Sequence, residues 1–251
     1  APISLATPSV SSETAYQVAG QWAGNARGDA FVKRYAGGVY SSGFYTLRSD
    51  GNYELQLDNA NTGGGAWLNY DAIYVGEDVA LVNQAYGGPS QGYRLYRRDA
   101  VSQRWSFRAE MAPYIGQHYF PVNSSTRLLG TAIHSASGRL LHLTRGPSYR
   151  TELIVEPASG SSMTMTNLQT GVPGVNYFAP NGVVSSSGYV LMTVSTAGGN
   201  RLLAWRPNAA LTTFTPQLLT APSGFTIGPA YQMVSALPDG GFVVNLIRTS
   251  D

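Results

Sequence analysis

A strand–turn–strand pattern recurs along this chain and restricts it to folds that are built from antiparallel hairpins. Asp50-Gly51 and Asp239-Gly240 each lie between two runs of alternating apolar and polar residues. An Asp-Gly pair in that position is the strongest short-range signal for a β-hairpin. Ser137-Gly138 takes the same place between two further runs. We therefore expect an all-β protein.

Three longer segments read as copies of one unit. Each consists of a strand, a turn, a strand that ends in Arg, a loop and a third strand, and the copies cover residues 79–107, 127–154 and 189–215. Their starts lie about 50 to 60 residues apart, which is close to the length of a propeller blade. The repeat predicts several similar sheets in one chain.

The two ends of the sequence fit the same repeat. Residues 241–247 read as strands of a last unit, and residues 29–35 have the form of the strand that this unit lacks. Pairing of these segments would close a ring and remove exposed edge strands. We expect a β-propeller of about five blades that is closed by pairing of the N- and C-terminal strands.

The same segments resemble known proteins. Asp239-Gly240-Gly241-Phe242-Val243-Val244, taken with Phe31-Val32-Lys33-Arg34-Tyr35, is similar to the repeat of bacterial and phage propeller-type modules. In those modules a DGGFVV strand precedes an aromatic strand that ends in Arg-Tyr. The resemblance implies an architecture and no particular activity.

Composition excludes several classes of protein. Charged residues make up 12% of the chain, and Lys occurs once, at Lys33. A surface helix needs a charged face. The only candidate helices are therefore short, at residues 12–23 and 108–111. A net charge of +2 is too weak to indicate a nucleic-acid partner. No apolar run approaches the roughly 18 residues of a membrane span. The absence of Cys excludes disulfides and thiolate metal sites.

Residues 1–13 are rich in Pro, Ser and Thr and show no periodicity. We expect an extended N-terminal arm here, followed by a single propeller-like domain over residues 14–251. Such an arm can pack on a neighbouring subunit, and a frayed end is the alternative. Ala1 fits either removal of an initiator Met or cleavage of a signal peptide.

No motif for catalysis or for a cofactor is found. Turn chemistry explains Asp50 and Asp239, and we find neither a nucleophile elbow nor a phosphate-binding loop. His134 and His142 are expected to face each other across one hairpin without a third ligand, so no metal site is expected. We predict no catalytic residue, no cofactor and no metal.

Aromatic and Arg side chains are the remaining candidates for a ligand site. Aromatic faces stack on sugar rings, and Arg pairs with carboxylates. The plainer interpretation is that aromatic residues pack between sheets. The candidate ligand-binding residues are Trp67, Tyr70, Tyr93, Arg97, Trp205 and Arg206.

Three functions fit these observations. The first is a structural or receptor-binding protein of a virion, such as a phage tail or fibre-associated component. The second is a secreted lectin-like or adhesion module of a bacterium. The third, a glycoside hydrolase, would need two converging carboxylates, and the turns account for the clearest ones. The expected partners are other structural chains or a cell-surface glycan, with a homo-oligomer possible, in a virion or outside the cell.

Overall fold

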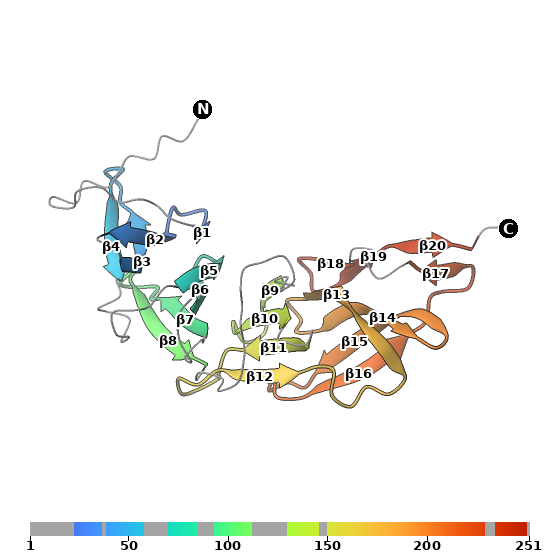
Figure 1. Cartoon of the computed structure of the whole chain (residues 1–251). Helices are drawn as coiled ribbons and strands as arrows, with labels where there is room; N and C mark the ends of the chain where they lie inside the picture. The colour runs from blue at the N-terminus through green and yellow to red at the C-terminus, as the bar shows by residue number, and fades with distance from the viewer. Residues whose placement is uncertain are drawn as a thin grey trace. The chain divides into compact units, whose positions relative to one another are not determined.

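The computed structural model describes residues 23–36, 39–57, 70–84, 93–111, 130–145, 150–228 and 234–249. Every regular element in these residues is a β-strand (Figure 1), and every pair of neighbouring strands is antiparallel. The predicted all-β class is confirmed. Within the described ranges no helix is long and apolar enough to cross a membrane. The expected arm at 1–13, residues 12–22 of the helical window at 12–23, and Trp67 lie outside the described residues.

The chain divides into two compact units, residues 1–116 and residues 117–251. Unit 1 holds two four-stranded sheets, and in both of them each strand pairs with the next along the chain. The strands of the first sheet are β1 (Ala23–Gly24), β2 (Ala30–Ala36), β3 (Val39–Leu47) and β4 (Tyr53–Leu57). Those of the second are β5 (Tyr70–Val75), β6 (Val79–Gln84), β7 (Tyr93–Arg98) and β8 (Trp105–Glu110). The helical window at 108–111 is thus wrong, because residues 108–110 end β8.

Aromatic rings fill the core between the two sheets of unit 1. The Phe44 ring is buried at their centre. Its centroid lies 4.9 Å from that of Phe31, 5.0 Å from that of Tyr96 and 5.0 Å from that of Trp105, onto which it stacks. Such pairs contribute roughly 0.5–1.5 kcal/mol each beyond the burial of their area. The two sheets are therefore held face to face by one aromatic cluster.

Unit 2 holds two more four-stranded sheets and a terminal hairpin. Its first sheet consists of β9 (Gly130–Ile133), β10 (Leu140–Arg145), β11 (Thr151–Val155) and β12 (Thr164–Asn167). Its second consists of β13 (Val175–Val184), β14 (Val190–Thr196), β15 (Gly199–Pro207) and β16 (Phe214–Leu219). Both repeat the up-and-down order of unit 1.

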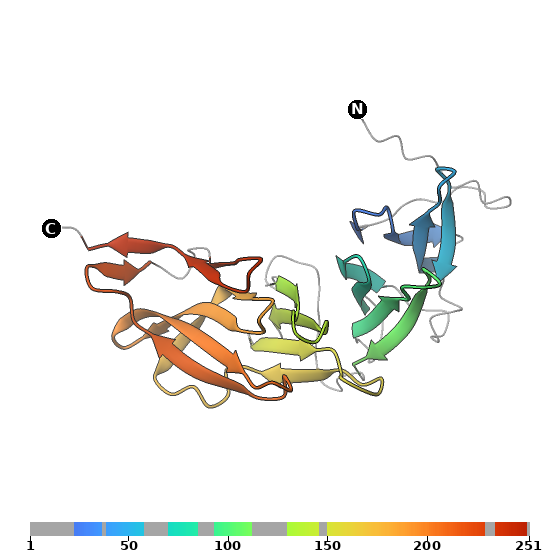
Figure 2. The same ribbon diagram turned by 180° about the vertical axis from the view of Figure 1, so that it is seen from behind.

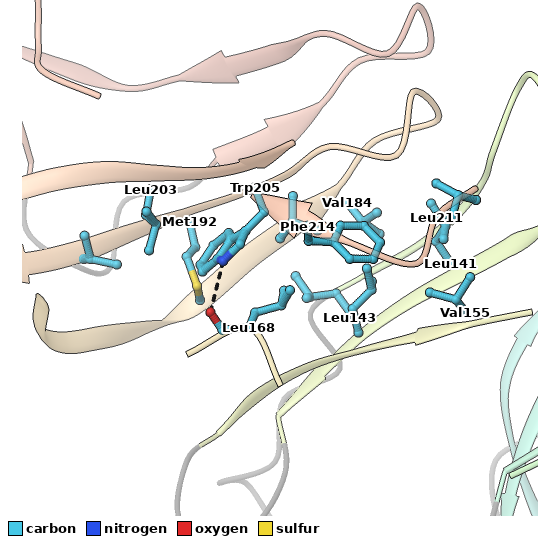
Figure 3. Packing of buried hydrophobic residues seen from close by; sticks show 13 residues of the cluster. Leu141, Leu143, Val155, Leu168, Val184, Met192, Leu203, Trp205, Leu211 and Phe214 are labelled. Carbon is cyan, nitrogen blue, oxygen red and sulfur yellow. Dashed lines mark hydrogen bonds between the residues drawn. The ribbon is translucent and has the colours of Figure 1, made fainter. Parts of the chain in front are cut away.

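The β13–β16 sheet is covered on both faces. On one face Met192 and Trp205 pack with Leu143 of the preceding sheet in a single buried cluster (Figure 3). On the other face Leu191 and Leu202 pack against the terminal hairpin. A strand that is covered on both sides reads as a continuous apolar run, and β14 begins with such a run, Val190-Leu191-Met192.

The described parts of the terminal hairpin, residues 225–228 and 234–248, belong to two passes of the chain. The first pass contains β17 (Phe225–Ile227) and β18 (Val234–Ala236), and the second contains β19 (Phe242–Val244) and β20 (Leu246–Arg248). Pairing of β18 with β19 and of β17 with β20 makes them the two arms of one long hairpin. In Figures 1 and 2, β20 lies on the outer side of β17.

The hairpin turn between the first two strands of a sheet recurs with the same hydrogen bonds. In the β13–β14 turn the Ser185 N–H donates to the Tyr189 carbonyl, and the Gly188 N–H donates to the Ser185 carbonyl. The same two bonds form at Asn25, Gly28 and Asp29, and again at Leu237, Gly240 and Gly241. Gly28, Gly188 and Gly240 have φ of 88°, 84° and 89°, a conformation that favours Gly.

These turns are also bonded from one sheet to the next. In unit 1 the Asn25 Nδ2 donates to the Gly76 carbonyl at 2.9 Å. In unit 2 the Ser135 N–H donates to the Ser186 carbonyl at 2.7 Å, and the Ser187 Oγ donates to the Gly240 carbonyl at 2.9 Å. In these three cases a donor of one turn, which differs in kind, reaches a main-chain carbonyl of the next sheet's turn.

The repeat that the sequence predicted is present, with one correction. The segments at 79–107 and 189–215 are both the second to fourth strands of a sheet, whereas 127–154 covers the first three strands of its sheet. The second copy is therefore displaced by one strand. In an up-and-down sheet every local stretch of sequence reads as strand, turn and strand, so the sequence does not show which strand of a sheet comes first.

The expected closing pair is not found among the ladders of the described strands. Residues 30–36 lie between β1 and β3, and Phe242–Val244 pair with β18. The closed ring, the number of blades and the single domain over 14–251 stay predictions.

Candidate functional site

Two of the candidate ligand residues lie on β7 of unit 1. Tyr93 is buried at 2% exposure, so its ring is part of the core. Arg97 is partly buried and its Nη1 lies 3.5 Å from the Asp78 carboxylate. Tyr70 begins β5, opposite Gln84 on β6. Unit 1 thus brings Tyr93 and Arg97 onto one strand.

Trp205 and Arg206 lie side by side on β15 of unit 2, with opposite exposure. Trp205 is 1% exposed, and its Nε1 donates a hydrogen bond of 3.0 Å to the Leu168 carbonyl (Figure 3). Arg206 is exposed. The Trp205 ring therefore packs inside the protein, and only its Arg neighbour reaches the surface.

The strand register places Tyr96-Arg97 on β7 and Trp205-Arg206 on β15 at similar positions. In these two sheets, an aromatic residue of the third strand is paired with the first or second residue of the second strand: Tyr96 with Ala80, and Trp205 with Val190. Each is followed by an Arg, Arg97 or Arg206. Tyr45 has the same place opposite Ala30. All three rings are buried, so the aromatic position of the repeat serves packing between sheets.

A buried polar group lies on β10, on the face turned away from the β13–β16 sheet. Leu141 and Leu143 point toward that sheet, so His142 between them points the other way. Its Nδ1 lies 2.8 Å from the Thr131 Oγ1 across the ladder. Burial lowers the pKa of His142 to about 4, despite a hydrogen bond to the Gly130 backbone that raises it. The imidazole is therefore neutral near pH 7.

Glu152 on β11 shares this face with His142. Its neighbour Leu153 points toward the β13–β16 sheet, as Leu141 and Leu143 do, so Glu152 points the other way. It is 4% exposed, and its Oε2 has no hydrogen-bond partner among the described residues. Burial raises the pKa of the Glu152 carboxyl, and Arg150 opposes this shift. Sequence reasoning missed this group, since an isolated Glu in a strand gives no signal of its face.

The expected pairing of His134 with His142 is wrong. His134 lies in the β9–β10 turn, where its Nδ1 is 2.8 Å from the Ser137 Oγ, and its backbone pairs with Arg139. Thr131 takes the place opposite His142. The two rings therefore belong to different parts of the hairpin.

A buried ion pair joins the two sheets of unit 1 near their turns. Asp29 is fully buried, and its Oδ2 accepts a hydrogen bond of 3.0 Å from the Asn25 Nδ2. The Arg98 Nε lies 3.5 Å from the same carboxylate oxygen. Loss of one partner of such a pair leaves an uncompensated charge. We assign these residues a structural role.

The terminal hairpin presents the clearest candidate surface for binding. Its inner face packs Phe242, Val244 and Leu246 against the preceding sheet. The residues that alternate with them point outward, and Val243 is 53% and Ile247 42% exposed. This outward face is therefore a candidate contact surface for another chain.

No family model and no curated protein matches the chain.

Proposed function

We propose that this chain is a non-enzymatic structural or receptor-binding protein, built as a propeller of about five blades, and that it is a virion component associated with a phage tail or fibre. The partners are other structural chains of the particle. The supporting observation is the repeated bond between the turns of successive sheets, carried by Asn25, Ser135 and Ser187. Contacts between successive sheets are what a ring of blades would require, and this is the sense in which they support the proposal.

The composition supports a place in an assembly. Only 12% of the residues are charged, and 29 of 251 are Gly, so the surface between partners has little charge to desolvate. The outward Val243 and Ile247 add apolar contact area. A rigid set of sheets with short turns is suited to hold binding loops or neighbouring chains in place.

The test is to locate the chain in particles. Antibodies raised against the purified protein are used to probe particles that have been separated on a density gradient from the culture that expresses the gene. We expect the chain to band with the particles and to stay with them after a wash in high salt. Recovery of the chain only in the particle-free fluid would contradict the proposal. Glycan hydrolysis that is lost on replacing a single Asp or Glu would also contradict it.

A lectin-like module is the second candidate, favoured by the repeated aromatic–Arg position at Tyr96-Arg97 and Trp205-Arg206. Both rings are buried, and Arg97 lies beside Asp78, so the exposed Arg206 is the side chain that would contact a ligand, such as an acidic glycan. A glycan array tests this directly. Binding that is lost in Arg206→Ala, with Arg201→Ala as the matched control on the same strand, would favour the lectin over the virion component.

A further inference from the structure

The terminal hairpin has fewer strands than the other described sheets. The four sheets that precede it have four strands each, whereas β17 and β18 form one pass of the hairpin and β19 and β20 form the other. In the part of the chain that the structure describes, β19 and β20 pair along one edge only, with β18 and β17. We call the opposite edge of residues 242–248 the free edge. Main-chain groups at such an edge can pair with another strand.

The hydrogen bonds at the two ends of the second pass show which of its residues face the free edge. The Leu237 N–H donates to the Gly241 carbonyl, and the Thr249 N–H donates to the Gly224 carbonyl. In an antiparallel ladder, alternate residues bond to the same neighbouring strand. The odd-numbered residues of the second pass therefore turn their main-chain groups toward the first pass. The even-numbered residues direct theirs to the free edge, and they are Phe242, Val244, Leu246 and Arg248.

The sequence at the free edge is complementary to a second copy of itself. When two copies of residues 242–248 run antiparallel about a two-fold axis at Asn245, residues at equal distances from Asn245 face each other. Val244 then lies opposite Leu246 of the second copy, and Val243 lies opposite Ile247 of the second copy. Even-numbered residues meet even-numbered ones, as main-chain pairing requires. Apolar side chains also meet on both faces of the sheet, which stabilises cross-strand pairs.

The charges along the second pass are complementary in the same arrangement. Asp239 lies in the turn at one end, Arg248 lies at the other end, and both are exposed. Residues 240–247 carry no charge. An antiparallel pair brings the Arg248 end of one copy to the Asp239 end of the other, whereas a parallel pair would place like charges together. A two-fold contact uses the same patch on both copies, so it requires this kind of self-complementarity.

We propose that two copies of this chain pair through the free edge, antiparallel about Asn245, so that two hairpins form one four-stranded sheet. The joined sheet has as many strands as each of the four preceding sheets. The strand of the second copy lies in the plane of the hairpin, so the inner face keeps its contacts with the β13–β16 sheet. Pairing over residues 242–248 is a small interface, and we expect a weak dimer that depends on protein concentration.

The absence of Cys allows a cross-linking test of the axis and the register. Asn245→Cys places two thiols opposite each other in a non-hydrogen-bonded pair with Cα atoms about 4.5 Å apart, within the range of a disulfide. Mild oxidation of the full chain should give a disulfide-linked dimer. Val243→Cys is the matched control and should stay reduced, because its two copies would lie about 13 Å apart along the strands. Val243→Cys combined with Ile247→Cys should restore the cross-link.

Charge at Asn245 gives a second test, measured by sedimentation velocity of the purified chain. We expect Asn245→Lys and Asn245→Asp each to weaken the dimer by at least about tenfold, because like charges would face each other on the axis. An equal mixture of the two variants should dimerise again. Ser235→Lys, exposed on β18 and away from the free edge, is the control and should leave the dimer unchanged.

Three results would overturn the inference. The first is a monomer at every protein concentration, which is expected if a segment of the same chain, such as the N-terminal strand of a closed ring, covers the free edge. The second is equal cross-linking of Asn245→Cys and Val243→Cys. The third is a dimer that neither charged variant weakens.

The inference goes beyond the proposed function, and its test needs no particles. A monomer that bands with particles would overturn the two-fold contact alone. A dimer that is recovered only in the particle-free fluid would overturn the virion assignment alone.

Discussion

Trp205 shows how much one side chain contributes to unit 2. Its ring lies in the cluster between two sheets, and its Nε1 satisfies the Leu168 carbonyl, which leads into the turn after β12. A buried carbonyl without a donor would cost about 1–3 kcal/mol. The residue thus combines apolar burial with one obligatory hydrogen bond.

Replacement of Trp205 should therefore be costly. We expect Trp205→Ala to lower the free energy of unfolding by about 3–5 kcal/mol through the cavity that it leaves. Trp205→Phe keeps most of the packing and should cost less, with the loss coming mainly from the unpaired Leu168 carbonyl. Urea unfolding followed by circular dichroism measures both. Arg206→Ala, exposed and adjacent, is the control and should change stability by less than about 0.5 kcal/mol; equal losses in all three variants would refute the core role.

The role of Trp205 could not be predicted from the sequence because the strand pattern is ambiguous. Alternation identifies the buried face only when one face is wet. In β15 the run Leu202-Leu203-Ala204-Trp205 is apolar at every position, so the sequence does not show which face the ring occupies. Aromatic residues suit both a sugar site and a core. Burial decides between these only once the neighbouring sheets are placed.

His142 should make stability depend on pH. Its pKa is about 4 in the folded protein and near 6.5 in the unfolded chain, so between these values the unfolded chain binds more protons. The free energy of unfolding should therefore fall as the pH decreases through this window, by about 2–3 kcal/mol between pH 7 and pH 4.5. Urea unfolding at the two pH values measures the change.

His142→Gln is the control for this pH dependence. It keeps a polar contact to Thr131 and should reduce the fall by most of that amount. Glu152, whose pKa is raised by burial, contributes stability at low pH that is lost as the pH rises through its folded pKa, and it is present in both proteins. An identical pH dependence in wild type and His142→Gln would show that His142 is not buried in neutral form.

Among the elements, the turns were the most predictable from sequence. The turns at Asp50-Gly51, Ser137-Gly138 and Asp239-Gly240 are all present, with φ of 83°, 66° and 89° at the Gly. These features depend on two or three adjacent residues, so local chemistry is sufficient. The assignment of strands to sheets depends on partners far along the chain, which is why the copy at 127–154 was displaced by one strand.

Gly188 tests the turn that recurs from sheet to sheet. A Cβ there would lie 3.1 Å from Pro207 Cγ and 3.2 Å from Leu211 Cδ2, and its φ is 84°. We expect Gly188→Ala to cost more than the roughly 1–2 kcal/mol of the left-handed conformation alone. Gly171→Ala is the matched control, since Gly171 has φ of 76° and nothing within 4 Å of a Cβ. Thermal unfolding of the two variants compares them, and a smaller loss at Gly188 would mean that its turn is looser than described.

At the scale of the whole molecule, the question is whether the sheets unfold together. Each unit has its own core, with Phe44 at the centre of one and Trp205 in the other. A closed propeller, as proposed, couples every sheet to two neighbours. Separate units would instead unfold in two steps.

A pair of core variants distinguishes these cases. We expect Phe44→Ala and Trp205→Ala each to lower the temperature of one common unfolding transition, because all sheets of a closed ring would unfold together. Differential scanning calorimetry records the transition, and the calorimetric enthalpy should equal the van't Hoff enthalpy. Two transitions, each shifted by only one of the variants, would argue for two independent units and against the ring.

The turn contacts between sheets bear on how a chain of this kind could gain or lose a whole sheet during evolution. The acceptors are the main-chain carbonyls of Gly76, Ser186 and Gly240, which every amino acid supplies. A duplicated segment of one sheet would meet the same docking groups on its new neighbour without any compensating side-chain change. Growth or loss by whole sheets is thus open to this architecture as long as each copy keeps a donor in its turn, as Asn25 and Ser187 supply here.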